Sequence, residues 1–452
     1  MRVAIFLGLL GLVTTHQLFA QDKGGPSRPN ILFILADDLG WGDVGFHGGQ
    51  VPTPNLDRLA SEGLELEQHY VYPVCTPTRV AFLTGRYASR FGVSTPQNER
   101  ALPWDTVTLP LALRSVGYDT ALCGKWHLGS KPEWGPQFFG FDHGYGSLAG
   151  GVGPWDHRYK VGPFTYTWHR NGELIEEQGH VTDLITKEAI RWLKSRTERP
   201  FFLYVAFTAV HIPIREPKEY LDRVPSSIQE PSHREYAACI LHLDDSVGKL
   251  LEGLEATQKA SQTVVVFTSD NGGTTARNDD PQYPPDGYTP GRAAGNNRPL
   301  KGAKGTVYEG GTRVPTVVRW PGVVKPGKYP SPVHITDWMP TFCTLAGYQP
   351  AKPLKWDGRD IGPFLFGAAE PSPRTVYTVG PNFRSLAFRD GEWKLIVHAA
   401  TNTEDERFEL YNLANDPNEE NNLATDFSEK VAELRAKLLA EAAGDRDSQV
   451  RE

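Results

Sequence analysis

The sequence predicts an α/β fold, in which a large, mixed and mainly parallel sheet is sandwiched by helices and followed by a smaller C-terminal α+β subdomain. Four near-continuous apolar runs are typical of strands that are buried on both faces of such a sheet. Helical patterns lie between these runs, and alternation of strands with helices indicates α/β architecture. After about residue 347 the pattern changes to a hairpin, a short strand and a final helix.

Each of the four apolar runs ends in polar residues. The runs cover residues 31–36, 118–123, 201–210 and 263–267. The polar residues that follow them are Asp37 and Asp38, then Lys125 and His127, then His211, and finally Asp270 and Asn271. Ligands of α/β sheets bind beyond the carboxyl ends of the strands, so the sequence predicts that these side chains meet in one site. We expect Lys125 and His127 to lie on an extended segment, where residues two apart face the same side.

Helices between the strands are expected over residues 54–60, 181–195 and 231–256. In the third helix, Ser232 and Glu235 have the spacing of a capping box, and apolar residues such as Ile240 and Leu254 recur on one face. The C-terminal elements are expected as a hairpin over 384–397 with its turn at 389–392, a strand over 407–413 and a closing helix over 428–442.

Composition and charge indicate an ordinary globular protein. The chain has 452 residues, and its 47 Lys and Arg against 54 Asp and Glu give a net charge of −7. This balance argues against a general nucleic-acid-binding protein, and four Cys are too few for a disulfide scaffold. Residues 1–20 have the layout of a secretory signal peptide, so we expect a secreted or periplasmic protein without a membrane anchor. The sequence has no Asn-x-Ser/Thr acceptor, which favours a bacterial source.

The most specific string is CTPTR at residues 75–79, followed by LTGR at 83–86. Thr76 is expected to be the N-cap of a helix and Pro77 its first residue. Cys75 would then lie at a helix N-terminus, where the helix dipole favours negative charge, and Arg79 would reach back to it from the next turn. Taken alone, the string favours an ordinary buried cysteine at the start of a helix.

The string resembles the signature of the type I sulfatases, in which this cysteine is oxidised after translation to formylglycine. Further segments are similar to the same family and occur in the same order. They are NILFILADDLG at 30–40, GKWHLG at 124–129, residues 140–142, SDNGG at 269–273, LKGAKGTVYEGGTRVP at 300–315, and residues 409–422. Within the family the chain is most similar to bacterial arylsulfatases and N-acetylgalactosamine-sulfatase-like enzymes.

The resemblance implies an alkaline-phosphatase-like fold. It places a catalytic sulfatase domain at residues 30–347, after the signal peptide and a linker at 21–29, and a C-terminal subdomain at 348–452. It also implies a formylglycine-generating enzyme as a maturation partner, and a sulfated saccharide or an aryl sulfate as the substrate.

Hard oxygen donors dominate two of the strand ends. Asp37, Asp38, Asp270 and Asn271 offer carboxylate and amide oxygens, which suit Ca²⁺ better than zinc. The resemblance assigns the same four residues as ligands of one calcium ion, completed by the modified Cys75.

The resemblance also implies roles for the cations and histidines. Arg79 and the calcium ion would ease ionisation of a hydroxyl on the hydrated aldehyde at residue 75, which is the nucleophile. Lys125 and Lys304 would neutralise the sulfate oxygens. His211 would protonate the leaving alcohol, and His127 would take a proton from residue 75 so that sulfate is expelled. Other histidines are expected to be structural, with His242 packing in the long helix.

We therefore expect a secreted hydrolase that cleaves sulfate esters on sulfated carbohydrates. One alternative is a phosphonate or phosphodiester hydrolase of the same superfamily. The other is a catalytically silent glycan-binding homologue whose cysteine is never oxidised.

Two loops, 147–169 and 278–299, are the candidates for determining the substrate. In the first loop, Trp155, His157 and Arg158 would either contact a sugar ring or pack the loop against the domain. Near and within the second loop, the candidates for binding further anionic groups of a polysaccharide are Arg277, Arg292 and Arg298.

Overall fold

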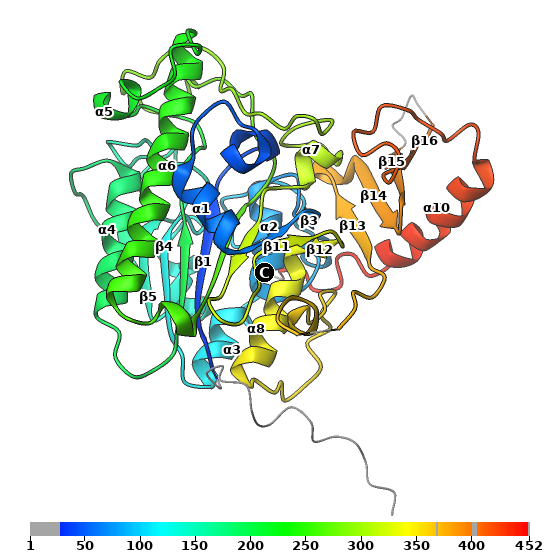
Figure 1. The fold of residues 1–452 in the computed structure, drawn as a ribbon, viewed down its shortest axis with the longest axis horizontal. Coiled ribbons are helices and arrows are strands. Elements are labelled where there is room, and N and C mark those ends of the chain that lie inside the picture. Colours follow the sequence, from blue (N-terminus) through cyan, green and yellow to red (C-terminus); the bar gives the residue numbers. More distant parts are fainter. Residues whose placement is uncertain (1–27, 368, 400–404, 451–452) are drawn as a thin grey trace, which may run out of the picture.

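The computed structural model describes residues 28–367, 369–399 and 405–450, and the predicted signal peptide lies outside them (Figure 1). Within these ranges no helix is both long enough and apolar enough to cross a membrane. The strands are β1 (Asn30–Ala36), β2 (Leu64–Leu66), β3 (His69–Tyr70), β4 (Asp119–Gly124), β5 (His143–Ser147), β6 (Trp168–Arg170), β7 (Glu173–Leu174), β8 (Phe201–Ala206), β9 (Thr263–Ser269), β10 (Val317–Arg319), β11 (Gly327–Tyr329), β12 (Val333–His334), β13 (Thr375–Val379), β14 (Ser385–Asp390), β15 (Trp393–His398) and β16 (Arg407–Asn412). The α-helices are α1 (Pro54–Glu62), α2 (Cys75–Thr84), α3 (Leu109–Ser115), α4 (Val181–Lys194), α5 (Lys218–Leu221), α6 (Pro231–Ala256), α7 (Glu309–Thr312), α8 (Trp338–Ala346), α9 (Gly362–Leu365) and α10 (Ser428–Ala442).

Ten strands form one large sheet in the order β11-β2-β10-β9-β1-β8-β4-β5-β6-β7. The central strand β1 is parallel to both of its neighbours, β8 and β9. β4 is parallel to β8 and to β5, whereas β10 and β6 pair in the antiparallel direction on the two flanks. The predicted mixed, mainly parallel sheet is confirmed.

Different helices cover the two faces of the large sheet (Figure 1). Side chains of β1 point alternately to the two faces. Phe33 packs with Phe82 of α2 and Trp338 of α8 in one core. Ile34 belongs to a second core, which contains Ile240 of α6 and is covered by α4 and α6. Because every residue of β1 is buried, the run shows no alternation of polar and apolar residues.

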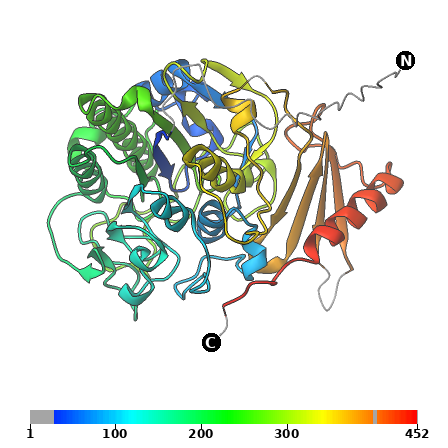
Figure 2. The ribbon, with the colours of Figure 1, turned by 90° about the horizontal axis from the view of Figure 1, so that it is seen from below.

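A second sheet, antiparallel and in the order β13-β14-β15-β16, lies at one side of the molecule with α10 packed against it (Figure 2). β14 and β15 form the predicted hairpin, and β16 and α10 match the predicted strand and closing helix. β13 was not predicted, because its five residues are too few to show a period. The predicted domain limit near residue 348 stays a prediction.

The segment after β8 departs from the predicted strand. The apolar run over 201–210 is a strand only as far as Ala206. Beyond it the chain leaves the sheet, and the amide of Val210 donates to the carbonyl of Asp37 at 2.7 Å. Burial of the turn explains why it is as apolar as the strand. The departure places His211 close to the end of β1.

The N-cap of α6 also differs from its prediction, although the helix begins at the predicted residue. Its N-cap is Glu230, whose carboxylate accepts a hydrogen bond from the amide of His233, and Ser232 is not the cap. Glu235 accepts a hydrogen bond from the amide of Glu216 at 2.9 Å, so it ties a distant loop to the helix.

Candidate active site

The polar residues that follow β1, β4, β8 and β9 meet at one edge of the large sheet. Parallel pairing of β1 with β8 and β9 sets Leu35 beside Ala206 and Ala36 beside Ser269, so the carboxyl ends of these strands line up. The amide of Asp270 donates to the carbonyl of Ala36 at 3.0 Å. The structure therefore brings together the side chains that the sequence placed at the strand ends.

Two lysines pair with the two acids after β1. Lys125 Nζ lies 2.6 Å from Asp37 Oδ2, and both side chains are fully buried. Lys304 Nζ lies 2.7 Å from Asp38 Oδ1, and the lysine side chain retains 19% exposure. Asp38 has a φ of 64°, a left-handed conformation that a non-glycine residue adopts at a cost and that is enriched in functional sites.

Arg79 completes the charge balance of the buried cluster. Its Nη2 donates to Asp270 Oδ2 at 2.9 Å, and its Nη1 donates to the carbonyl of Lys125 at 2.7 Å. The three acids after the strands thus face three cations, Arg79 and the two lysines, inside a protein interior. We expected Arg79 to reach back to Cys75, but its hydrogen bonds go to the strand ends.

Two buried oxygens in the cluster fit a hard cation. Within the described residues, Asp37 Oδ1 and Asn271 Oδ1 have no hydrogen-bond partner. Asn271 donates from Nδ2 to Asp38 Oδ1 at 2.7 Å, which fixes its amide so that Oδ1 remains available as a ligand. Oxygen atoms of Asp37 and Asp38 and a ring nitrogen of His211 lie within 4.8 Å of one another. Buried oxygens without donors are costly unless something else pairs with them.

The two acids after β1 differ in acidity. Burial, with the nearby charge of Asp270, raises the pKa of Asp37 to about 7 even though Lys125 opposes the shift. Burial also acts to raise the pKa of Asp38, but Lys304 and His211 outweigh it and lower that pKa to about 2. A divalent cation against these oxygens would favour the ionised form of both acids.

Cys75 is the first residue of α2, and its side chain is buried. The N-cap is Val74 rather than the predicted Thr76, whose hydroxyl instead accepts a hydrogen bond from the amide of Gln97 at 3.3 Å. Thr78 donates from its hydroxyl to the carbonyl of Asp270 at 2.7 Å, so the helix start is attached to the end of β9. Burial raises the pKa of the Cys75 thiol although Lys125 opposes the shift.

The two candidate proton-transfer histidines occupy different depths. His127 is buried at 3% exposure and has a φ of 56°, so the segment after β4 is not the extended one we predicted. His211 is partly exposed, its Nε2 lies 3.8 Å from Asp38 Oδ2, and its Nδ1 hydrogen-bonds the carbonyl of Ile212. Burial lowers the pKa of both rings well below the usual value; Lys125 contributes next for His127 and Lys304 for His211.

A cavity of about 280 Å³ opens from this cluster to the surface. Asp38, His211 and Lys304 of the cluster line it. The other lining residues are Lys160, Ile212, Thr274, Ala276, Asp280 and Tyr283.

The two candidate specificity loops meet beside this cavity. The amide of Val161 donates to the carbonyl of Gln282 at 2.7 Å, and Lys160 Nζ lies 3.1 Å from Asp280 Oδ2. Tyr283, which our sequence reasoning missed, lies in the second loop with its side chain buried. No pattern marked it, because an isolated tyrosine among prolines and aspartates resembles ordinary loop packing.

Two glycines of the first loop lie against the candidate catalytic groups, and sequence reasoning did not single them out. A Cβ on Gly150 would lie 2.2 Å from His127 Nε2. A Cβ on Gly151 would lie 2.1 Å from the hydroxyl oxygen of Tyr283 and 3.5 Å from His211 Cε1. Side chains are excluded at both positions by close approach.

The aromatic and basic residues singled out in the first loop pack the loop. Trp155 donates to the carbonyl of Arg215 at 2.9 Å, and His157 stacks on Trp168 with ring centroids 4.8 Å apart. Arg158 pairs with Asp156 at 3.0 Å. None of these three candidates lines the cavity of the cluster.

The arginines considered for binding further anions have local partners. Arg277 Nη2 lies 2.6 Å from Asp279 Oδ2. Arg292 donates from Nη1 to the carbonyl of Thr275 at 3.0 Å. Arg298 is exposed, and it does not line the cavity either.

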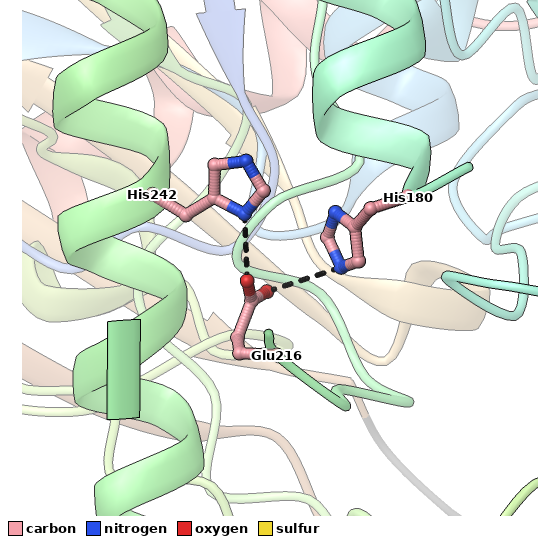
Figure 3. A group of neighbouring side chains, drawn as sticks. All are labelled: His180, Glu216 and His242. Carbon is pink, nitrogen blue, oxygen red and sulfur yellow. Dashed lines mark hydrogen bonds and ion pairs between the residues drawn. The ribbon is translucent and has the colours of Figure 1, made fainter. Parts of the chain in front are cut away.

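A second buried cluster is formed by His180, Glu216 and His242 (Figure 3). Two of its members, His180 and Glu216, line a small pocket together with His211. His242 Nδ1 is 2.7 Å from one oxygen of Glu216, and His180 Nε2 is 3.6 Å from the other. His180 Nδ1 accepts a hydrogen bond from the amide of Thr182, so its proton is on the Nε2 that faces Glu216. His242 is thus hydrogen-bonded to Glu216, and His180 lies just beyond hydrogen-bond distance of the same carboxylate, so His242 does more than pack the helix.

The fold agrees with the comparisons with known proteins. The chain belongs to the sulfatase family, because the family model described as Sulfatase matches residues 29–348. A second model, described as N-sulphoglucosamine sulphohydrolase, C-terminal, matches residues 303–445.

Particular relatives include arylsulfatase J of Mus musculus, which is 35% identical over 383 residues. That alignment covers 82% of this chain and 61% of the relative. N-acetylgalactosamine-6-sulfatase of Canis lupus familiaris is 32% identical over 408 residues, covering 85% of this chain and 74% of the relative.

Solved structures show the same architecture. The structure of Ps i-CgsB in complex with k-i-k-neocarrahexaose has a TM-score of 0.81 and 30% identity, and covers 94% of this chain and 95% of that one. The PsFucS1 sulfatase from Pseudoalteromonas sp. has a TM-score of 0.76 and 26% identity, and covers 92% of this chain and 90% of that one.

Proposed function

We propose that this protein is an exported sulfate ester hydrolase that acts on sulfated carbohydrates. The observation that carries the proposal is the buried cluster at the strand ends, where acids and cations surround the start of α2 and its Cys75. Three carboxylates and three cations in a protein interior are costly to keep without a function. Membership of the sulfatase family, and relatives that are named sulfatases, support the same proposal.

The proposal includes two groups that the family uses. A calcium ion would be held by Asp37, Asp38, Asp270 and Asn271, and a formylglycine would be made from Cys75 by a maturation enzyme. The ion supplies positive charge to the sulfate, and the hydrated aldehyde supplies the nucleophilic hydroxyl. The two unpartnered oxygens described above support the ion. The string CTPTR at residues 75–79, which resembles the family's signature, supports the modification.

The cations of the cluster bind and orient the sulfate group. Lys304 lines the cavity. Its ammonium group is paired with Asp38, and it can also bind the sulfate of a substrate in the cavity. Arg79, fixed by Asp270, holds positive charge beside the start of α2. Charge held in place before substrate arrives costs little reorganisation when negative charge develops on the ester.

The histidines move protons on opposite sides of the reacting group. His211 lines the cavity, so it is placed to protonate the oxygen of the leaving sugar. His127 is buried beside Gly150 and does not line the cavity, which supports its proposed role as the base that takes a proton from residue 75. A deep base and a more exposed acid suit a reaction in which one product remains inside while the other departs.

Paired aryl substrates test the proposed function. Sulfate, phosphate and phosphodiester esters of one phenol present the same leaving group, so their rates compare the transferred groups alone. The matured protein is expected to favour the sulfate ester. A preference for the phosphodiester would instead support the alternative esterase of the same superfamily, and no hydrolysis of any ester would support a silent glycan-binding protein.

A further inference from the structure

The residues that line the cavity form two chemical groups. Lys304 and His211 are the groups proposed to receive the sulfate and the leaving oxygen. Lys160, Asp280 and Tyr283 line the same cavity and have no role in that chemistry. A volume of about 280 Å³ is at the small end of ligand pockets, which commonly span about 300–1,000 Å³. The cavity therefore holds a single ring more readily than a length of polysaccharide.

Tyr283 lies beside His211, the residue proposed to protonate the leaving oxygen. It is therefore close to the expected position of the sugar carbons next to that oxygen. Its hydroxyl oxygen and His211 Cε1 lie 2.1 Å and 3.5 Å from the same point, the Cβ position of Gly151, so the two groups are neighbours. Burial raises the pKa of Tyr283 well above the usual value, so its hydroxyl keeps its proton and can donate a hydrogen bond. The phenol ring is also 3% exposed, with Tyr159 edge-on at 5.8 Å, which holds it in position.

Lys160 and Asp280 present a balanced pair to the cavity. Lys160 Nζ lies 3.1 Å from Asp280 Oδ2 and donates to Gln282 Oε1 at 3.3 Å. Their side chains retain 30% and 18% exposure, so both also reach solvent. A lysine already paired with a carboxylate offers donors and acceptors to hydroxyl groups but little net charge to an anion.

We propose that Tyr283, Lys160 and Asp280 form a saccharide subsite, which selects a sugar unit whose only charge is the sulfate being removed. The inference rests on the proposed function and names its substrate class. Asp280 accepts hydrogen bonds from ring hydroxyls and neutralises Lys160, which leaves no free positive charge for a second sulfate or a carboxylate. The candidate arginines for binding further anions, Arg277, Arg292 and Arg298, do not line the cavity, and the first two have local partners.

The experiment uses the full-length matured enzyme and three substrates: an aryl sulfate, a monosulfated N-acetylhexosamine and its disulfated form. The variants are Tyr283→Phe, Lys160→Met and Asp280→Asn. The matched control is Lys437→Met, because Lys437 pairs with Glu433 at 2.8 Å on α10 and does not line the cavity. Melting temperatures are measured for all of them.

Wild-type enzyme is expected to prefer the monosulfated sugar to the disulfated one. Each subsite variant should lose about 10-fold or more in kcat/KM on the monosulfated sugar, and less on the aryl sulfate, which has no ring hydroxyls. Asp280→Asn should also reduce the discrimination against the disulfated sugar, and Lys437→Met should match wild type. If Asp280→Asn lowers the melting temperature, Lys160→Met decides the question, because its side chain is partly exposed.

Equal losses on the aryl and sugar sulfates, or a wild-type preference for the disulfated sugar, would overturn the subsite while the sulfatase proposal stands. If wild-type enzyme hydrolyses no sulfate ester, both proposals fall together.

Discussion

His211 shows at the scale of one residue how its surroundings select the atom that reacts. Its Nδ1 faces the carbonyl of Ile212, and a carbonyl only accepts hydrogen bonds, so Nδ1 keeps a proton. The proton delivered to a leaving oxygen must therefore come from Nε2, the nitrogen that lies 3.8 Å from Asp38. Burial and the nearby Lys304 lower the pKa of the ring, whereas the Asp38 carboxylate opposes that shift. A bound sulfate anion would oppose it further, so substrate binding favours the doubly protonated ring.

Replacement of His211 by alanine tests this assignment. A sugar alkoxide needs protonation to leave, and general acid catalysis contributes about 10²–10⁴-fold, so turnover of a sulfated sugar should fall by that factor. A nitrophenolate leaves without help, so an activated aryl sulfate should lose much less. Rates for both substrates at saturation give the answer, and equal losses would remove His211 from the role of acid.

Removal of calcium tests the oxygen cluster. An ion that binds only the folded protein stabilises it by about 2.7 kcal/mol when its concentration is 100 times Kd. Chelation is therefore expected to lower both the melting temperature and the rate, and added Ca²⁺ to restore them. Zn²⁺ should restore less, since the donors are all oxygen. An unchanged melting temperature after rigorous chelation would count against the site.

At the scale of elements, buried strands and the long helix were predictable because each has a long, uninterrupted signal. α6 begins and ends where its apolar stripe indicated, at Pro231 and Ala256. The turn after β8 was not predictable, because buried turn residues are as apolar as strand residues. The backbone conformation of His127 was not predictable either. It has a left-handed φ, and its amide donates to the carbonyl of Leu148, a contact between distant segments that the sequence does not reveal.

The loop that carries His211 is fastened to two helices by the His180–Glu216–His242 cluster (Figure 3). Burial opposes protonation of His242, but Asp183, 3.6 Å from Nε2, and Glu216, hydrogen-bonded to Nδ1, prevail and raise its pKa to about 9. Loss of Glu216 would leave a buried imidazolium without its nearest partner. Breaking a buried pair in this way costs about 3–5 kcal/mol.

Glu216→Gln is therefore expected to lower the free energy of unfolding by about 3–5 kcal/mol. His242→Gln should show the matching pH dependence in denaturant titrations. The folded pKa is raised above the unfolded value of 6.5, so the contribution of His242 is complete below pH 6.5 and is lost as pH rises through about 9. His233→Gln, on an exposed side chain of the same helix, is the control. A difference between wild type and His242→Gln that grows from pH 6.5 to 9 would contradict the assignment.

At the scale of the whole molecule, the C-terminal sheet is attached to the segment that carries Lys304. Lys394 of β15 lies 2.8 Å from Glu309 of α7 and 2.9 Å from Glu419, and all three side chains are buried. α7 follows the Lys304 loop after only a few residues. This pairing was not predictable from sequence, because Lys394 and Glu309 are 85 positions apart and belong to different elements, β15 and α7.

Lys394→Met should leave the buried Glu419 without its ammonium partner, and Glu309 with the more distant Arg313 at 3.8 Å as its remaining cation. It should lower the free energy of unfolding by about 3–5 kcal/mol. We also expect a higher KM for aryl sulfate, since the Lys304 loop loses its support. Lys437→Met removes an exposed lysine of α10 and should change neither quantity. A loss of stability with an unchanged KM would show that the C-terminal sheet does not position the sulfate-binding loop.

Release of inorganic sulfate from a monosulfated sugar, by wild type and by Cys75→Ala after co-expression with a formylglycine-generating enzyme, tests the central claim most directly. The claim predicts steady release by wild type, with residue 75 found as formylglycine by peptide mass spectrometry. It predicts no release above background by Cys75→Ala at an unchanged fold. Substantial release by Cys75→Ala, or turnover by wild type whose Cys75 is unmodified, would contradict it.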